Sequence, residues 1–60
     1  MIKFVTYGKD KQTAHKGGAF LGWLVLRSGT WEARPNGWSP QTFETLNKAK
    51  RYFWAYANKL

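Results

Sequence analysis

The sequence has no cysteine, one histidine and only three acidic residues, and each shortage argues against a class of function. Without cysteine there is no disulfide, no thiolate nucleophile and no zinc–sulfur site. His15, Asp10, Glu32 and Glu44 are too few and too scattered to predict a metal site, a carboxylate pair or a nucleophile–base pair. We therefore expect a protein that is not an enzyme and that needs no metal and no cofactor.

Long hydrophobic runs are also missing. The longest apolar run, residues 19–26, is too short to span a membrane. The opening residues, Met1-Ile2-Lys3-Phe4, have no signal-peptide organisation. With the lack of cysteine, these observations predict a cytoplasmic protein without a membrane span.

Basic and aromatic residues are abundant. Ten Lys and Arg against three acids give a net charge of +7 in 60 residues, and this balance favours a polyanionic partner. Four Trp, four Phe and three Tyr supply the core of what we expect to be one small domain, residues 1–60.

Residues 20–35 show the strongest structural pattern. Two runs rich in aliphatic, β-branched and aromatic residues flank Ser28-Gly29, which predicts a hairpin with a two-residue turn. Alternation then divides the side chains between two faces. One face, the expected core, collects Phe20, Leu24, Leu26, Trp31 and Ala33; the other collects Leu21, Trp23, Val25, Arg27, Thr30, Glu32 and Arg34. A three-residue turn would exchange the faces of one strand.

The flanking segments are less regular. Residues 2–7 are rich in β-formers and predict a strand, whereas the polar, glycine-bounded residues 8–18 predict a flexible basic loop. Pro35-Asn36-Gly37 predicts a turn, and residues 38–43 predict a further strand that Pro40 confines to a sheet edge. Residues 1–19 are thus expected to form a strand and loop, and residues 20–43 an antiparallel sheet.

Residues 45–60 give the best helix pattern. Thr45 is a candidate N-cap, and no glycine or proline follows it. Apolar residues recur at spacings of three and four, forming the stripe Leu46, Ala49, Phe53, Tyr56 and Leu60. We therefore predict an α+β fold, in which a three- to four-stranded antiparallel sheet carries one C-terminal helix on one face and leaves the other face open.

The open face has the chemistry of a nucleic-acid-binding surface. The guanidinium groups of Arg27 and Arg34 match the acceptors of guanine in the major groove of duplex DNA. Glu32 can accept from a cytosine amino group or can simply neutralise an arginine, and Trp23 can contact sugars and bases or only pair with Arg34. The lysines of the predicted loop, Lys9, Lys11 and Lys16, would contact phosphates. The predicted DNA-binding residues are Trp23, Arg27, Thr30, Glu32, Arg34, Lys9, Lys11 and Lys16.

Two other surfaces remain as alternatives. Trp54 falls off the helix stripe, so it either packs on neighbouring side chains or, with Trp38, anchors a protein partner, such as a host factor that a small viral protein inhibits. The basic, aromatic helix also allows binding to an anionic membrane, but the core needs its apolar stripe, which argues against that alternative.

The pattern of residues 29–34 (GTWEAR), followed by a turn and by Thr42-Phe43-Glu44-Thr45 at the start of a helix, resembles the DNA-binding domain of plant ethylene-response (Apetala-type) factors. The arm-binding domains of phage and transposon integrases share that fold. The resemblance covers residues 20–60 and implies a sheet face that lies in the major groove, with Glu32 and Arg34 on the DNA side. Pro40 and the position of Trp38 depart from the family pattern, so it implies no contacts from the third strand. The small size suits a phage or mobile-element regulator.

Overall fold

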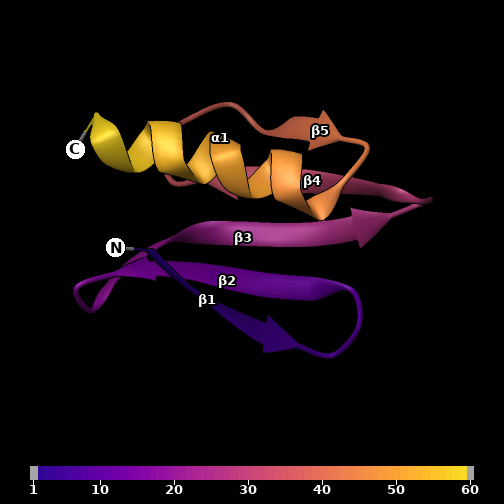
Figure 1. Cartoon of the computed structure of the whole chain (residues 1–60), viewed down its shortest axis with the longest axis horizontal. Helices are drawn as coiled ribbons and strands as arrows, with labels where there is room; N and C mark the ends of the chain where they lie inside the picture. The colour runs from indigo at the N-terminus through magenta and orange to yellow at the C-terminus, as the bar shows by residue number, and fades with distance from the viewer. Residues whose placement is uncertain (1, 60) are drawn as a thin grey trace.

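The computed structural model describes residues 2–59 and consists of a five-stranded antiparallel sheet with one helix across one face (Figure 1). The elements are β1 (Ile2–Tyr7), β2 (Lys11–Lys16), β3 (Ala19–Arg27), β4 (Thr30–Pro35), β5 (Gln41–Phe43) and α1 (Leu46–Asn58). The strands lie in the sheet in the order β1-β2-β3-β4-β5, each beside its neighbour in the chain. The α+β class is confirmed, with one strand more than the upper expected number.

The β3–β4 hairpin has the predicted turn and register. Ser28 and Gly29 both have positive φ values, 49° and 79°, as the two central residues of a type I′ turn require. Arg27 pairs with Thr30, and the pairing continues to Trp23 opposite Arg34. The division of β4 and of the second half of β3 into two faces is therefore confirmed.

A β-bulge near the start of β3 changes the faces of two residues. His15 pairs with Phe20, but the preceding Ala14 pairs with Gly22, so β3 has one extra residue at this point. As a result Leu21 is buried in the core, at 2% exposure, and Phe20 is exposed, at 40%. The predictions that Phe20 belongs to the core and that Leu21 belongs to the open face are both wrong.

Gly22 allows this bulge because β3 and β4 approach each other closely there. A Cβ atom on Gly22 would lie 2.8 Å from the Cα atom of Pro35 and would overlap the carbonyl oxygen of Arg34. Gly22 also has a φ of 150°, which side-chain-bearing residues rarely adopt. Only glycine satisfies both conditions.

The predicted basic loop, residues 8–18, is wrong over most of its length. Residues 11–16 form β2, which pairs with β1 on one side and with β3 on the other. Strand propensity depends strongly on context, and pairing on both edges overrides the polar composition of this segment. The glycines that suggested a loop lie in the two tight turns, at Gly8 and at Gly17-Gly18.

The last strand is shorter than predicted. The expected strand over residues 38–43 is reduced to Gln41–Phe43, which lies at the sheet edge beside β4. Pro40 precedes it, consistent with a residue that cannot donate to the ladder. Trp38 instead belongs to the turn after β4, where its N–H donates to the carbonyl oxygen of Pro35 at 3.2 Å.

Helix α1 begins at the predicted cap. The hydroxyl of Thr45 accepts a hydrogen bond from the backbone N–H of Lys48 at 3.2 Å. The predicted stripe faces the sheet, and Ala57 joins it as a buried residue that the spacing pattern had not included. Leu60, the last predicted member of the stripe, lies outside the described residues.

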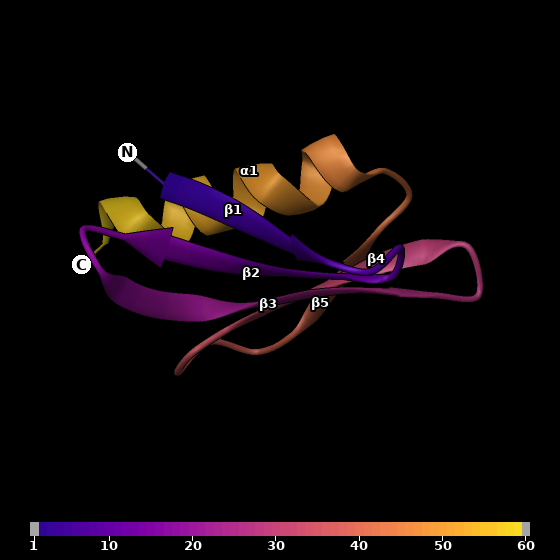
Figure 2. The same ribbon diagram turned by 90° about the horizontal axis from the view of Figure 1, so that it is seen from below.

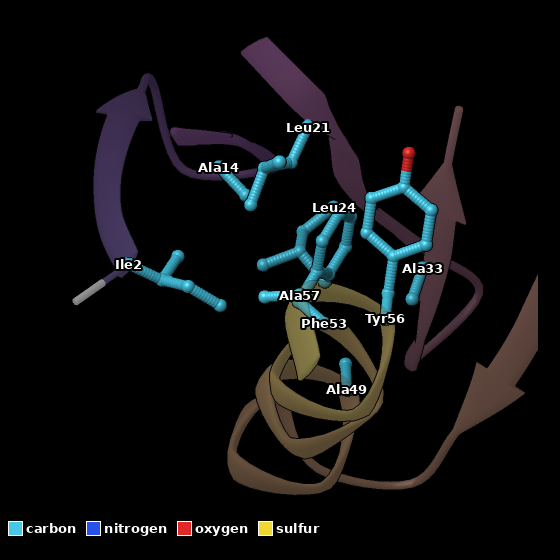
Figure 3. Close-up of a cluster of buried hydrophobic side chains, with 9 residues drawn as sticks. All are labelled: Ile2, Ala14, Leu21, Leu24, Ala33, Ala49, Phe53, Tyr56 and Ala57. Atoms are coloured by element: carbon cyan, nitrogen blue, oxygen red, sulfur yellow. The ribbon is translucent and has the colours of Figure 1, made fainter. Parts of the chain in front are cut away.

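The core lies between α1 and one face of the sheet (Figure 3). Its members come from β1, β2, β3, β4 and α1: Ile2, Ala14, Leu21, Leu24, Ala33, Ala49, Phe53, Tyr56 and Ala57. Figure 2 shows α1 along one side of the sheet, and no element within residues 2–59 covers the other side. No helix in this part of the chain is long and apolar enough to cross a membrane.

Candidate functional site

The uncovered side of the sheet, here called the open face, gathers side chains from all five strands. Side chains of residues that pair across antiparallel strands lie on the same face of the sheet, so the register shows which residues of each strand belong to the open face. The open face carries Lys3, Val5 and Tyr7 of β1, Lys11, Thr13 and His15 of β2, Phe20, Trp23, Val25 and Arg27 of β3, Thr30, Glu32 and Arg34 of β4, and Thr42 of β5. It is therefore basic and aromatic, as predicted for the hairpin alone, and it extends over β1 and β2.

A hollow of about 360 Å³ lies on the β1–β3 half of this face. Its lining residues, the aromatic hollow, are Tyr7, Lys11, Thr13, His15, Phe20 and Trp23. Large aromatic side chains are normally buried, yet three of these remain accessible: Tyr7 is 56% exposed, Phe20 40% and Trp23 36%. Exposed aromatic residues around a concavity are typical of a binding site.

Contacts among the lining residues hold the aromatic hollow in shape. Phe20 stands edge-on to Trp23, with ring centroids 5.2 Å apart, and to His15, at 5.7 Å. Thr13 is buried, and its hydroxyl shares a hydrogen bond of 2.8 Å with His15 Nε2. The imidazole and the phenyl ring are thus fixed by neighbours within the hollow rather than by the core.

Lys11 covers part of the aromatic surface. Its Nζ lies 4.0 Å from the centre of the Trp23 ring, within the range of a cation–π interaction. The two residues come from adjacent strands, because Lys11 pairs with Val25, two positions along β3 from Trp23. The predicted cross-strand pair of Trp23 and Arg34 is also present, but the cation over the ring is Lys11.

The other half of the open face is a charged strip on β3 and β4. Arg34 is half exposed, and its Nε lies 3.9 Å from Oε1 of Glu32. That distance is too long for a hydrogen bond, and the buried Oε1 accepts none from the described residues. Arg27 is exposed at the end of β3, where its carbonyl oxygen accepts a hydrogen bond from the hydroxyl of Thr30.

Two of the three predicted phosphate-binding lysines do not lie on the open face. Lys9 lies in the turn between β1 and β2, at one end of the sheet. Lys16 pairs with Ile2, a core residue, so it belongs to the face that α1 covers. Only Lys11 lies among the other predicted residues, and it does so as part of a strand rather than of a flexible loop.

The two tryptophans of the alternative surface differ in their surroundings. Trp38 is half-buried and packs against Tyr52 and Tyr56, with ring centroids 5.5 and 5.1 Å away, so it extends the core. Trp54 is 44% exposed on α1. Of the two, only Trp54 has the exposure that a partner-binding anchor needs.

The sequence interpretation did not place Tyr7, Thr13, His15 and Phe20 in a site. Residues 11–16 show no polar–apolar alternation, because Ala14 is their only apolar residue, and the basic and glycine-rich surroundings favour a loop. Phe20 was assigned to the other face because strict alternation was assumed through Gly22, although a glycine inside a strand is a sign of a bulge or of a close backbone approach.

Within residues 2–59, no three His, Asp or Glu side chains gather closely enough to hold a metal ion.

No protein-family model, no curated protein and no solved structure matches this chain.

Proposed function

We propose that this protein binds nucleic acid through the open face, without catalysing a reaction, and that duplex DNA is the ligand of the charged strip. The observation that carries the proposal is that three exposed aromatic side chains and four of the ten cationic residues lie together on the one face that α1 leaves uncovered. An uncovered sheet face of a monomeric protein is normally polar and mixed in charge. Here its only acid, Glu32, is largely shielded beside Arg34.

Electrostatics favours this ligand. With a net charge of +7, the protein attracts polyanions over several ångströms, and phosphates replace condensed counterions when they contact Lys or Arg. Lys3, Lys11, Arg27 and Arg34 extend across four neighbouring strands of the open face. Such a surface can follow a sugar–phosphate backbone.

The charged strip also has groups that can read bases. A two-stranded antiparallel ribbon fits the major groove, where an arginine guanidinium can donate two hydrogen bonds to guanine. Glu32 keeps 22% of its side chain exposed beside Arg34, and a carboxylate can accept a hydrogen bond from a cytosine amino group. The Glu32–Ala33–Arg34 step is also the part that resembles the Apetala-type domains, whose fold would lay this face in the groove.

The test is a duplex-DNA titration of the protein and of its Arg27→Ala and Arg34→Ala variants, using a sequence selected from a random library and a scrambled control. We expect each variant to lose about 1–3 kcal/mol of preference for the selected sequence, while binding of the scrambled duplex falls much less. Variants that keep the full preference would overturn the assignment to the charged strip. A role as a phage or mobile-element regulator in the cytoplasm forms part of the same proposal.

A second candidate function rests on Trp54. An exposed tryptophan on a helix is a common energetic anchor of protein interfaces, so the protein can instead capture and inhibit a host factor. The two functions separate in one comparison. Trp54→Ala should leave DNA binding unchanged if the open face is the site, and should abolish partner capture if α1 is.

A further inference from the structure

We infer that the aromatic hollow receives one unpaired nucleobase, so that the protein binds single-stranded nucleic acid by inserting a base beside Trp23. The inference rests on the proposed function and concerns a different half of the open face. The charged strip faces a backbone or a groove, whereas the hollow is concave and holds three exposed aromatic residues.

The size and lining of the hollow match a nucleobase. Its volume of about 360 Å³ lies at the lower end of the range for small-molecule sites, roughly 300–1,000 Å³. Rings of Phe20 and Trp23 stand at 71° to each other, so a flat ligand can stack on one ring and meet the edge of the other. Every nucleobase has such a flat π-face.

Lys11 explains why the ligand should carry a phosphate as well as a ring. Its ammonium group now lies over Trp23, where it shields the face on which a base would stack. A phosphate carries a full negative charge, whereas the face of an aromatic ring carries only the partial negative charge of its quadrupole. A phosphate attached to the incoming base therefore attracts the Lys11 ammonium more strongly than the Trp23 ring does. A nucleotide can therefore draw Lys11 aside and occupy the Trp23 face in one step. An uncharged aromatic ligand would have to displace the ammonium without compensation.

Two lining residues of the hollow carry polar groups. They are the Thr13 hydroxyl and the His15 imidazole, which are already held by their shared hydrogen bond. Both groups can donate to or accept from the edge of a base. Bases in a duplex are stacked and paired, and cannot enter a concave site without leaving the helix. Unpaired strands, loops and ends are therefore the ligands that the hollow fits.

The experiment compares four probes of equal length at two salt concentrations: a mixed-sequence DNA single strand, the matching RNA strand, a DNA strand of abasic sites and a blunt DNA duplex. The variants are Phe20→Ala and Tyr7→Ala, neither of which lies in the charged strip. Trp54→Ala, on α1, is the matched aromatic control. Far-ultraviolet circular dichroism confirms that each variant is folded, as expected for exposed side chains.

We expect the protein to bind at least one base-bearing strand about 5- to 150-fold more tightly than the abasic strand, which has the same phosphates. The two hollow variants should lose most of that difference, while Trp54→Ala keeps it. The relative affinities of the DNA and RNA strands then identify which kind of strand the hollow prefers. Equal binding of base-bearing and abasic strands, or full retention of the difference in both hollow variants, would overturn the inference.

The outcomes also separate the inference from the proposed function. If the duplex binds but the base-bearing strands bind no better than the abasic strand, the hollow takes no base and the charged strip remains the site. Lack of binding by every probe at the lower salt concentration would overturn both.

Discussion

Gly22 determines which side chains form the aromatic hollow, because the bulge beside it turns Phe20 to the open face and Leu21 to the core. We expect Gly22→Ala to destabilise the protein by about 2–3 kcal/mol, since the new methyl group would press on the backbone of Arg34 and Pro35. Urea denaturation followed by circular dichroism measures the loss.

The control for this variant is Gly18→Ala. Gly18 also has a positive φ, 86°, but a Cβ atom there would meet nothing within 4 Å. Its substitution should cost only the backbone strain, about 1 kcal/mol. Equal losses in the two variants would show that the close approach of β3 and β4 is not what requires glycine at position 22.

Side-chain faces were predictable from the sequence only where a turn determines the register. Ser28-Gly29 specifies a two-residue turn, and the turn fixes every pair from Arg27 opposite Thr30 to Trp23 opposite Arg34. The faces of Phe20 and Leu21 depend on how closely β3 approaches the end of β4, a contact between distant parts of the chain. Alternation within one strand contains no information about that contact.

At the scale of elements, α1 depends on a single side-chain cap. Thr45→Ala removes the acceptor of the Lys48 N–H, and we expect a loss of about 1 kcal/mol in the free energy of unfolding. Thr45→Ser keeps the hydroxyl and should keep most of the stability. Thermal and urea denaturation of the three proteins measure the difference, and a serine variant as unstable as the alanine variant would show that the hydroxyl is not the stabilising group.

Helix α1 could be predicted well and β2 could not, for a physical reason. The apolar spacing and the cap of α1 are local, and both are visible in the sequence. Strand β2 is held by two partners, β1 and β3, and has only Ala14 and Thr13 as buried residues. Since pairing rather than its own composition makes it a strand, Thr13 and His15 of the aromatic hollow were missed with it.

At the scale of the whole molecule, cationic residues on the two sides of the sheet make it possible to test whether binding depends on the net charge or on the position of the charges. One triple variant replaces Lys3, Lys11 and Arg27 of the open face with glutamine; its control replaces Lys48, Arg51 and Lys59 of the helix side. Each changes the net charge from +7 to +4. We expect only the open-face variant to lose most of its nucleic-acid affinity. Its plot of log K against log salt concentration should also be less steep, with the slope smaller by about one for each phosphate contact removed. Equal losses would mean that binding follows overall charge alone.

The strand order has a consequence for how the chain reaches its native state. Every strand pairs with its immediate neighbour in the sequence, and short connections of a few residues join the strands. No pairing has to wait for a long loop to close, so the entropic barrier to forming the sheet is small for a mostly β protein. The sheet still buries its apolar face only against α1, so we expect the hairpins to form quickly but to become stable together with the helix.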